Sequence, residues 1–408
     1  MQGHRTFNWF TDGVTAPAGF AAAGIQAGIK PAHDKKDMAL IFAGRPAVVA
    51  GVFTTNQVKA APVILCRRRI KKSRLAQAVI INSGNANACT GGKGSADAES
   101  MAATTAKLLN INPSLALVCS TGTIGVPLPM EKIKRGIGLA VKNLARNGGG
   151  EAARAIMTTD TRSKQIAVRL RIGGKKITIG AMAKGAGMIA PNMATLLVFI
   201  TTDAAVAPAA LQEALSSAVA MSFNCILVDG DQSTNDTILC LANGLAGNRT
   251  LTRQQPGWKI FQSALTALCQ KLAYMIVEDG EGVTKVVRLI VKGGQSRAEA
   301  EKVARSIARS PLVKTSWFGA DPNWGRIMCA IGYSGAAIDP EKISIDYNGR
   351  LAVINGQSAG LPPKNLTKII TGKEFTIGID LHRGRASYSM LTCDCSLDYV
   401  RINADYMT

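Results

Sequence analysis

The segment Gly185-Ala186-Gly187-Met188-Ile189-Ala190-Pro191-Asn192-Met193-Ala194-Thr195 runs into the apolar stretch 196–200 near the middle of the 408-residue chain. Its first six residues match the GxGxxA pattern of dinucleotide-binding folds, which requires a strand before the glycines and a helix after them. A strand-like run precedes the glycines, but a proline and a second strand-like run follow them. The segment therefore predicts a strained turn that enters a strand, and it argues against a doubly wound dinucleotide-binding fold.

Strand-like and helical patterns are mixed along the rest of the chain without strict alternation. Strands are expected at 46–54, 77–82, 115–120, 165–172, 195–201, 225–228, 286–291, 327–331, 343–347, 351–354, 375–380 and 386–392. Helices are expected at 96–109, 131–147, 208–223, 258–275 and 297–308. This mixture favours an α/β protein in which sheets and helices pack in layers. From about residue 296 onward, a helix followed by short strands indicates a smaller α/β unit.

The composition is that of a globular protein, with 47% apolar and 18% charged residues. The most apolar region, residues 188–200, is too short to span a membrane and contains Pro191, Asn192 and Thr195. The opening residues, MQGHRTFNWF, lack the apolar core of a signal peptide. We therefore expect a cytoplasmic protein with no membrane partner.

The net charge is strongly positive, because 48 basic residues stand against 27 acidic ones and give +21. Such a charge suits nucleic acids or polyanionic substrates as partners. The basic residues cluster in one run, 66–74, which contains no aromatic side chain on which a base could stack. We interpret this run as a solvated loop and expect no nucleic-acid partner.

Histidine and cysteine usage argues against a metal site. The three histidines, His4, His33 and His382, lie far apart, and the nine cysteines contain no CxxC pair. The cysteines are expected to be reduced thiols. A catalytic base, if there is one, is therefore expected to come from a group other than histidine.

Thr195 is a candidate nucleophile that needs no histidine. If the peptide bond before it were cleaved, its new α-amine, with a pKa of about 8, could serve as its own base. The alternative is that Thr195 is an ordinary strand former. Two further glycine-rich segments are ambiguous in the same way: 120–125 suits an oxyanion hole or a plain turn, and 279–282 suits a carboxylate site or a solvated turn.

Together these segments resemble the ornithine acetyltransferases, also called glutamate N-acetyltransferases, of arginine biosynthesis. The matching motifs follow the family order over essentially the whole chain: 13–17, 82–92, 120–125, 157–161, 184–195, 229–237, 279–282, 319–326 and 399–408. One departure is Gln232, where the family usually has threonine.

The resemblance implies a precursor that cuts itself between Ala194 and Thr195 into an alpha chain, 1–194, and a beta chain, 195–408. The two chains would stay together and pair into a heterotetramer. The fold implied is an α/β/β/α sandwich, similar to N-terminal-nucleophile hydrolases but with its own topology. Residues of about 195–295 would complete the catalytic core, and about 296–408 would include the smaller α/β domain.

The resemblance also implies the site. Thr195 would be the nucleophile, and Thr121 and Gly122 would form the oxyanion hole. The substrate-binding positions would be Thr158, Lys184, Thr195, Glu281, Asn403 and Thr408. The reaction implied is ping-pong transfer of acetyl from N²-acetyl-L-ornithine to L-glutamate through acetyl-Thr195, without metal or cofactor.

Three readings stay open. Some family members also take acetyl from acetyl-CoA, and no residue decides whether this chain does. A paralogue or amidohydrolase could apply the same acyl-threonine chemistry to another acyl-amino acid. A basic nucleic-acid-binding protein is the alternative from a different class, although no binding module is recognisable.

Overall fold

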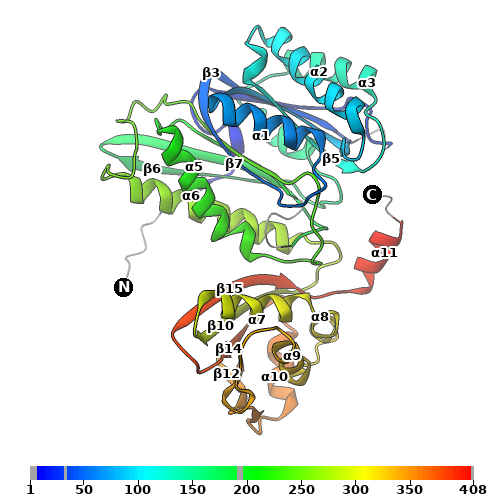
Figure 1. The fold of residues 1–408 in the computed structure, drawn as a ribbon, viewed down its shortest axis with the longest axis vertical. Helices are drawn as coiled ribbons and strands as arrows, with labels where there is room; N and C mark the ends of the chain where they lie inside the picture. Colours follow the sequence, from blue (N-terminus) through cyan, green and yellow to red (C-terminus); the bar gives the residue numbers. More distant parts are fainter. Residues whose placement is uncertain (1–6, 32–34, 191–195, 406–408) are drawn as a thin grey trace.

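The structure is a computed structural model that describes residues 7–31, 35–190 and 196–405. Within these residues the chain forms a nine-stranded and a six-stranded sheet. Figure 1 shows the two sheets in separate lobes, with α11 (Leu397–Asp405) lying beside the junction between them. Ala194, Thr195 and Thr408 lie outside the described residues.

The large sheet has the strand order β1-β6-β7-β8-β9-β3-β4-β5, with β2 paired to β3. Its strands are β1 (Asn8–Phe10), β2 (Phe20–Ile25), β3 (Met38–Phe53), β4 (Leu75–Asn85), β5 (Ala116–Thr123), β6 (Lys164–Ile172), β7 (Lys175–Lys184), β8 (Leu197–Thr202) and β9 (Thr237–Ala242). The pairs β4–β5 and β8–β9 are parallel, and the other pairs are antiparallel. The apolar run after the glycine-rich segment is therefore a central strand, β8.

Alternating side chains on the large sheet serve two different cores. On β8, Phe199 faces an inner core that also holds Ile81 of β4 and Met182 of β7. Its neighbour Ile200 faces the outer core formed with α5 (Pro208–Ala220) and α6 (Trp258–Glu278). Strands from both ends of the sheet thus share the inner core, which requires the sheet to fold over on itself.

A second outer core covers the other half of the large sheet. There β3 and β4 pack against α2 (Gly91–Leu109) and α3 (Met130–Lys142). The order helices, sheet, sheet, helices confirms the expected α/β/β/α sandwich. The helix α4 (Gly149–Ala155) contributes its alanines to the inner core.

The six-stranded sheet has the order β13-β12-β11-β14-β10-β15. Its strands are β10 (Val286–Gly294), β11 (Ser344–Tyr347), β12 (Arg350–Ile354), β13 (Gln357–Ser358), β14 (Glu374–Asp380) and β15 (Ala386–Cys393). It packs with α7 (Arg297–Arg309), α8 (Pro311–Phe318), α9 (Trp324–Gly332) and α10 (Pro363–Ile370). This sheet includes β10, which lies just before residue 296, where the sequence places the start of the smaller α/β unit.

Two of the expected strands are wrong. Residues 327–331 form part of α9, because Asn323 caps the helix by accepting a bond from the Arg326 amide at 3.1 Å. Its buried residues Ile327, Ala330 and Ile331 have helical spacing. Residues 225–228 form only an isolated bridge at Ile226.

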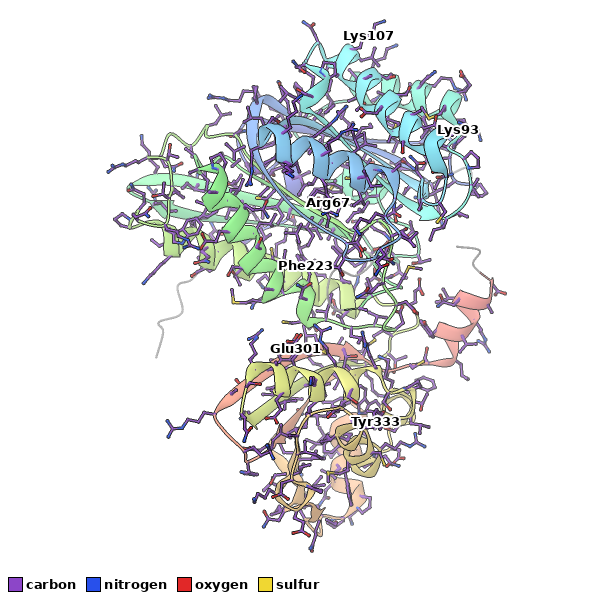
Figure 2. All side chains as sticks on the ribbon, in the orientation of Figure 1. Arg67, Lys93, Lys107, Phe223, Glu301 and Tyr333 are labelled. Carbon is purple, nitrogen blue, oxygen red and sulfur yellow. The ribbon has the colours of Figure 1, made fainter. Side chains whose placement is uncertain are left out.

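The basic run 66–74 is also not a loop. It forms the C-terminal half of α1 (Ala61–Ser73), where burying Cys66 and Ile70 gives the run an inner face. Arg67 points outward from α1, and Lys93 and Lys107 do so from α2 (Figure 2). Part of the excess positive charge therefore lies on the outer helical layer.

One described helix, α6, is long and apolar enough to cross a membrane by length and composition alone. From the sequence, we expect no stretch of the chain to reach the length of a membrane helix, and by length and composition α6 contradicts that expectation. Slightly more than half of its apolar window, 56%, is buried inside the protein. Phe261, Leu265 and Leu272 of this helix are fully buried in the outer core, which makes α6 a core helix of the large lobe.

Candidate active site

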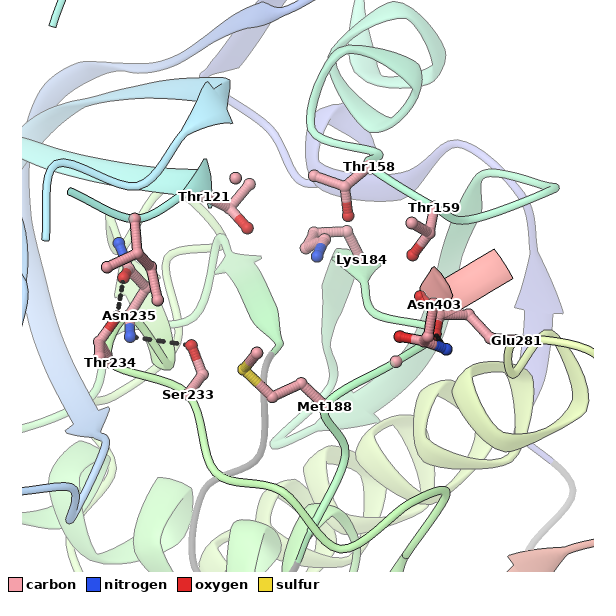
Figure 3. Close-up of a pocket in the computed structure, with 13 residues that line it drawn as sticks. Thr121, Thr158, Thr159, Lys184, Met188, Ser233, Thr234, Asn235, Glu281 and Asn403 are labelled. Atoms are coloured by element: carbon pink, nitrogen blue, oxygen red, sulfur yellow. Dashed lines mark hydrogen bonds between the residues drawn. The ribbon is translucent and has the colours of Figure 1, made fainter. Parts of the chain in front are cut away.

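A pocket opens where the ends of β5 and β7 meet the loops before β9 and after α6. It is lined by Thr121, Gly122, Ile124, Thr158, Thr159, Lys184, Gly187, Met188, Ser233, Thr234, Asn235, Glu281 and Asn403. Figure 3 shows Thr121 and Asn235 on one side, Glu281 and Asn403 on the other, and Lys184 between them. Hydroxyl, amide, ammonium and carboxylate groups therefore converge on one hollow.

Thr121 and Gly122 lie near the end of strand β5, and Gly122 has a backbone conformation that only glycine adopts easily. Gly122 has φ +132°, and a Cβ there would lie 2.3 Å from the carbonyl carbon of Gly84 on β4. Asn235 supports this end of β5, because its Nδ2 donates to the Ser120 carbonyl oxygen at 2.8 Å. This fixed strand end places Thr121 and Gly122 at the pocket wall, which suits an oxyanion hole.

Lys184 is the last residue of β7, and its side chain is buried with only 3% of its surface exposed. Its ammonium makes no hydrogen bond or ion pair to any residue in the described ranges. Burial lowers its pKa, while the carboxylates of Asp160, Asp236 and Glu281 act in the opposite direction. A buried ammonium that faces a pocket without a direct partner is poised to bind an anionic group.

Glu281 and Asn403 form the opposite wall. Asn403 Nδ2 of α11 donates to Glu281 Oε2 at 2.8 Å. The carboxylate lies so close to Gly187 that a Cβ on residue 187 would be 2.3 Å from Glu281 Oε2. The Glu281 amide donates to the Ala186 carbonyl oxygen at 3.1 Å, so the two loops are joined. Glycine at 187 thus makes room for the acidic side chain.

A buried ionic network supports the floor of the pocket. Lys164 Nζ contacts both Asp160 Oδ1, at 2.7 Å, and Asp279 Oδ2, and the three side chains are at most 2% exposed. Asp160 also accepts bonds from the Gly185 amide at 2.8 Å and the Thr158 amide at 3.0 Å. Burial alone would raise the pKa of Asp160, but Lys184 and Lys164 hold it down to about 2. The network therefore fixes the positions of Thr158 and Lys184.

The loop 229–236 holds the chain on both sides of residues 191–195. Asp229 accepts bonds from the amides of Met188, at 2.6 Å, and Ile189, at 2.9 Å. Asp236 Oδ1 accepts a bond from the Leu196 amide at 3.0 Å. Two carboxylates on one loop thus hold the residues that flank the segment in which the sequence places the cleavage site.

The structure brings together every predicted site residue that it describes. Thr121, Gly122, Thr158, Lys184, Glu281 and Asn403 all line the pocket. Residues 82–92 do not line it; Asn82 and Asn85 are buried and brace the neighbouring backbone, as in the bond from Asn82 Nδ2 to the Asn85 carbonyl oxygen at 2.8 Å.

Sequence reasoning assigned no role to several lining residues, namely Thr159, Met188, Ser233, Thr234 and Asn235. The available signal was that all five lie inside the motifs 157–161, 184–195 and 229–237. Among the described residues no group of three or more His, Cys, Asp or Glu side chains could hold a metal ion. The nine cysteines are unpaired thiols.

Comparison with known proteins gives consistent matches along the chain. A sequence model of the ArgJ family matches residues 21–408. An "Arginine biosynthesis bifunctional protein ArgJ" from Symbiobacterium thermophilum is 50% identical over 401 residues, which is 98% of this chain and 100% of that protein. The protein of the same name from Bacillus subtilis is 43% identical over 98% of this chain and 97% of its own length.

Two solved structures are similar in sequence. A crystal structure of arginine biosynthesis bifunctional protein argJ from Bacillus halodurans is 43% identical; it covers 51% of this chain and 98% of its own, with a TM-score of 0.50. A structure of ornithine acetyltransferase complexed with ornithine from Mycobacterium tuberculosis is 44% identical; it covers 47% of this chain and 100% of its own, with a TM-score of 0.43.

Proposed function

The chain belongs to the ArgJ family, and from this premise we propose that it is the acetyltransferase of arginine biosynthesis that moves acetyl from N²-acetyl-L-ornithine to L-glutamate. The products are L-ornithine and N-acetyl-L-glutamate. The observation that carries the proposal is that one pocket is lined by the buried ammonium of Lys184, by Thr121 and Gly122 of β5, and by the carboxylate of Glu281.

The pocket has a group for each part of an acetylated amino acid. The Lys184 ammonium pairs with the α-carboxylate, aided by the Thr158 hydroxyl. The Glu281 carboxylate, oriented by Asn403, takes the side-chain ammonium of ornithine. The acetyl carbonyl then lies toward Thr121 and Gly122. Thr408, outside the described residues, is proposed as a further substrate contact.

The chemistry we propose is acyl transfer through Thr195. The Thr195 hydroxyl attacks the acetyl carbonyl carbon, its own α-amine takes the proton, and the Thr121 hydroxyl and Gly122 amide stabilise the oxyanion. Ornithine leaves, glutamate enters the same pocket, and its amine takes the acetyl group from Thr195. Because both substrates use one pocket in turn, the kinetics are ping-pong, and no metal or cofactor takes part.

This chemistry requires that the chain be cut between Ala194 and Thr195. The solved chain from Bacillus halodurans is matched over 98% of its length by only 51% of this chain. Such a half-length chain is what a cut near residue 194 would leave, and this supports self-cleavage. We further propose that two alpha and two beta chains assemble into a heterotetramer in the cytoplasm, and that acetyl-CoA serves as a second acetyl donor.

Intact-mass measurement of the denatured protein, combined with a transfer assay, tests the proposal. We expect two chains, the second beginning at Thr195, and acetyl transfer from acetylornithine to glutamate with parallel initial-velocity lines. Thr195→Ala should stay as a single chain and be inactive, whereas Thr195→Ser should be cut and keep part of the activity.

Three results would contradict the proposal: an uncut wild-type chain that is fully active, intersecting initial-velocity lines, or an acetyl group passed to water faster than to glutamate. The last result would instead identify the amidohydrolase reading.

A further inference from the structure

A buried carboxyl group at the start of β9 is not used by any of the steps above. Asp236 is 1% exposed, and its Oδ1 accepts the bond from the Leu196 amide at 3.0 Å. Its other oxygen, Oδ2, is fully buried and has no hydrogen-bond partner among the described residues. Buried polar atoms in native proteins are nearly always paired, so an unpaired carboxyl oxygen needs an explanation.

The surroundings of Asp236 favour its neutral form. Burial raises its pKa well above the usual range, and the Leu196 amide, the Lys184 ammonium and the Thr54 hydroxyl offset this only in part. Lys184 of β7 is the charged side chain that acts on it. Thr54, which follows β3, uses its hydroxyl proton to bond the Ser233 carbonyl oxygen at 2.7 Å. In its neutral form the Asp236 carboxyl group is a proton donor, and the Thr54 hydroxyl oxygen is the neighbouring acceptor.

The covalent chain places this donor next to the proposed cleavage site. The nitrogen of Leu196, which Asp236 holds, is bonded to the carbonyl carbon of residue 195. Neighbouring residues are only about 3.8 Å apart along the chain. Asp236 thus holds the residue that directly follows Thr195 in the sequence.

We propose that Asp236 is the proton donor for cleavage of the bond between Ala194 and Thr195, an inference that rests on the proposed self-cleavage. The Thr195 hydroxyl oxygen adds to the Ala194 carbonyl carbon, and the C–N bond breaks as the nitrogen takes the Asp236 proton. The hydroxyl proton returns to Asp236, so the acid is regenerated. Water then hydrolyses the ester, giving the Ala194 carboxylate and the Thr195 hydroxyl, and the new α-amine takes the released proton.

Asp236→Asn separates proton donation from positioning. An asparagine oxygen can still accept the Leu196 amide, but the side chain cannot act as an acid. The full chain is refolded from denaturant, and its cleavage is followed by intact mass. We expect the variant to be cut at least about 100-fold more slowly than wild type, the usual minimum effect of a general acid.

Asp203→Asn is the matched control. Asp203 lies just after the other end of β8, is buried, and likewise accepts backbone amides, from Thr178 at 2.8 Å and Ala18 at 3.2 Å. Burial raises its pKa too. This variant should be cut at the wild-type rate. The proposal would be overturned if Asp236→Asn were cut at the wild-type rate, or if both variants were cut equally slowly.

The pH dependence of wild-type cleavage gives a test that needs no variant to fold. The rate should fall as the pH rises through the raised pKa of Asp236, since the acid form is then lost. A rate that only rises between pH 5 and 9 would overturn the proposal. A wild-type chain that is never cut would instead refute the proposed self-cleavage, so the two failures are distinguishable.

Discussion

Asn403 and Glu281, which are 122 residues apart in sequence, are joined by a hydrogen bond of 2.8 Å across the pocket wall. None of the residues of α11, the helix that carries Asn403, is buried, and Leu397 and Val400 of that helix are 67% and 60% exposed. Through this bond α11, an otherwise loosely packed helix, contacts the wall of the site.

Asn403→Ala should raise the KM for acetylornithine about tenfold or more, because the Glu281 carboxylate loses the side chain that orients it and so pairs less well with the ornithine ammonium, a charge-assisted bond of about 1.5–3 kcal/mol. The unfolding free energy should change by less than about 0.5 kcal/mol, since the residue is exposed. Steady-state kinetics and urea denaturation measure the two effects. Arg401→Ala, on the same helix but away from the pocket lining, is the control and should leave KM unchanged. A destabilised variant with wild-type KM would contradict this role.

Thr121→Val removes the hydroxyl of the proposed oxyanion hole and nearly preserves side-chain shape. We expect kcat to fall about 100- to 1,000-fold, the usual effect of losing one such donor. Gly122→Ala should do more damage, because the added Cβ would meet the Gly84 backbone at 2.3 Å. It should lower both the melting temperature and kcat, whereas Thr121→Val should lower kcat alone. An unchanged kcat in Thr121→Val would rule out the hydroxyl as a donor.

Lys184→Met should weaken recognition of the substrate carboxylate. Removing a buried ammonium relieves a desolvation cost, but the buried Asp160 carboxylate loses a favourable charge, so the two effects on stability oppose each other. We expect kcat/KM for glutamate and acetylornithine to fall at least about 30-fold, as for a lost charge-assisted bond. Lys176→Met, at the exposed end of the same strand, should behave as wild type. Equal losses in both variants would indicate a general charge effect.

The stability of the protein should depend on pH through Asp229. Burial raises the pKa of this carboxyl group to about 6, although the amides of Asp231, Met188 and Ile189 pull it down. The folded state therefore binds the proton more tightly than the unfolded chain, whose pKa is about 4. The stabilisation is fully present below pH 4 and is lost as pH rises through about 6.

Urea denaturation of wild type and Asp229→Asn across this range isolates the effect. The wild-type unfolding free energy minus that of the variant should fall between about pH 4 and pH 6 and then stay level. A difference that is constant with pH would show that Asp229 keeps an ordinary pKa.

The layered fold was predictable where the sequence pattern is unambiguous. Residues 196–200 are apolar on both faces, as a central strand requires, and form β8. The run 327–331 is equally apolar but short, and a short apolar run cannot by itself distinguish helix from strand. Here the Asn323 side chain caps the first turn of α9, which favours the helix. By length and composition α6 could cross a membrane, but Lys259, Gln270 and Lys271 lie on its exposed face, as on a helix that packs against a core.

The site could be predicted only through the resemblance. Its described lining residues come from six separated stretches of the chain, 121–124, 158–159, 184–188, 233–235, 281 and 403. No spacing rule brings such stretches together, since the bent sheet does so. The supporting role of Asn235, which bonds the Ser120 and Ala86 carbonyl oxygens, depends on contacts more than 100 residues apart in sequence.

The strand order of the large sheet gives the proposed cleavage junction a further meaning. β8 and β9, from one side of residue 195, lie between β7 and β3, from the other side. Neither half contains all the strands of this sheet, and Asp236, which directly precedes β9, accepts the bond from the Leu196 amide, which directly precedes β8. A cut at residue 195 would therefore occur only in a chain that has already folded this sheet. A nascent or misfolded chain would stay uncut, and each cut molecule would contain the assembled sheet.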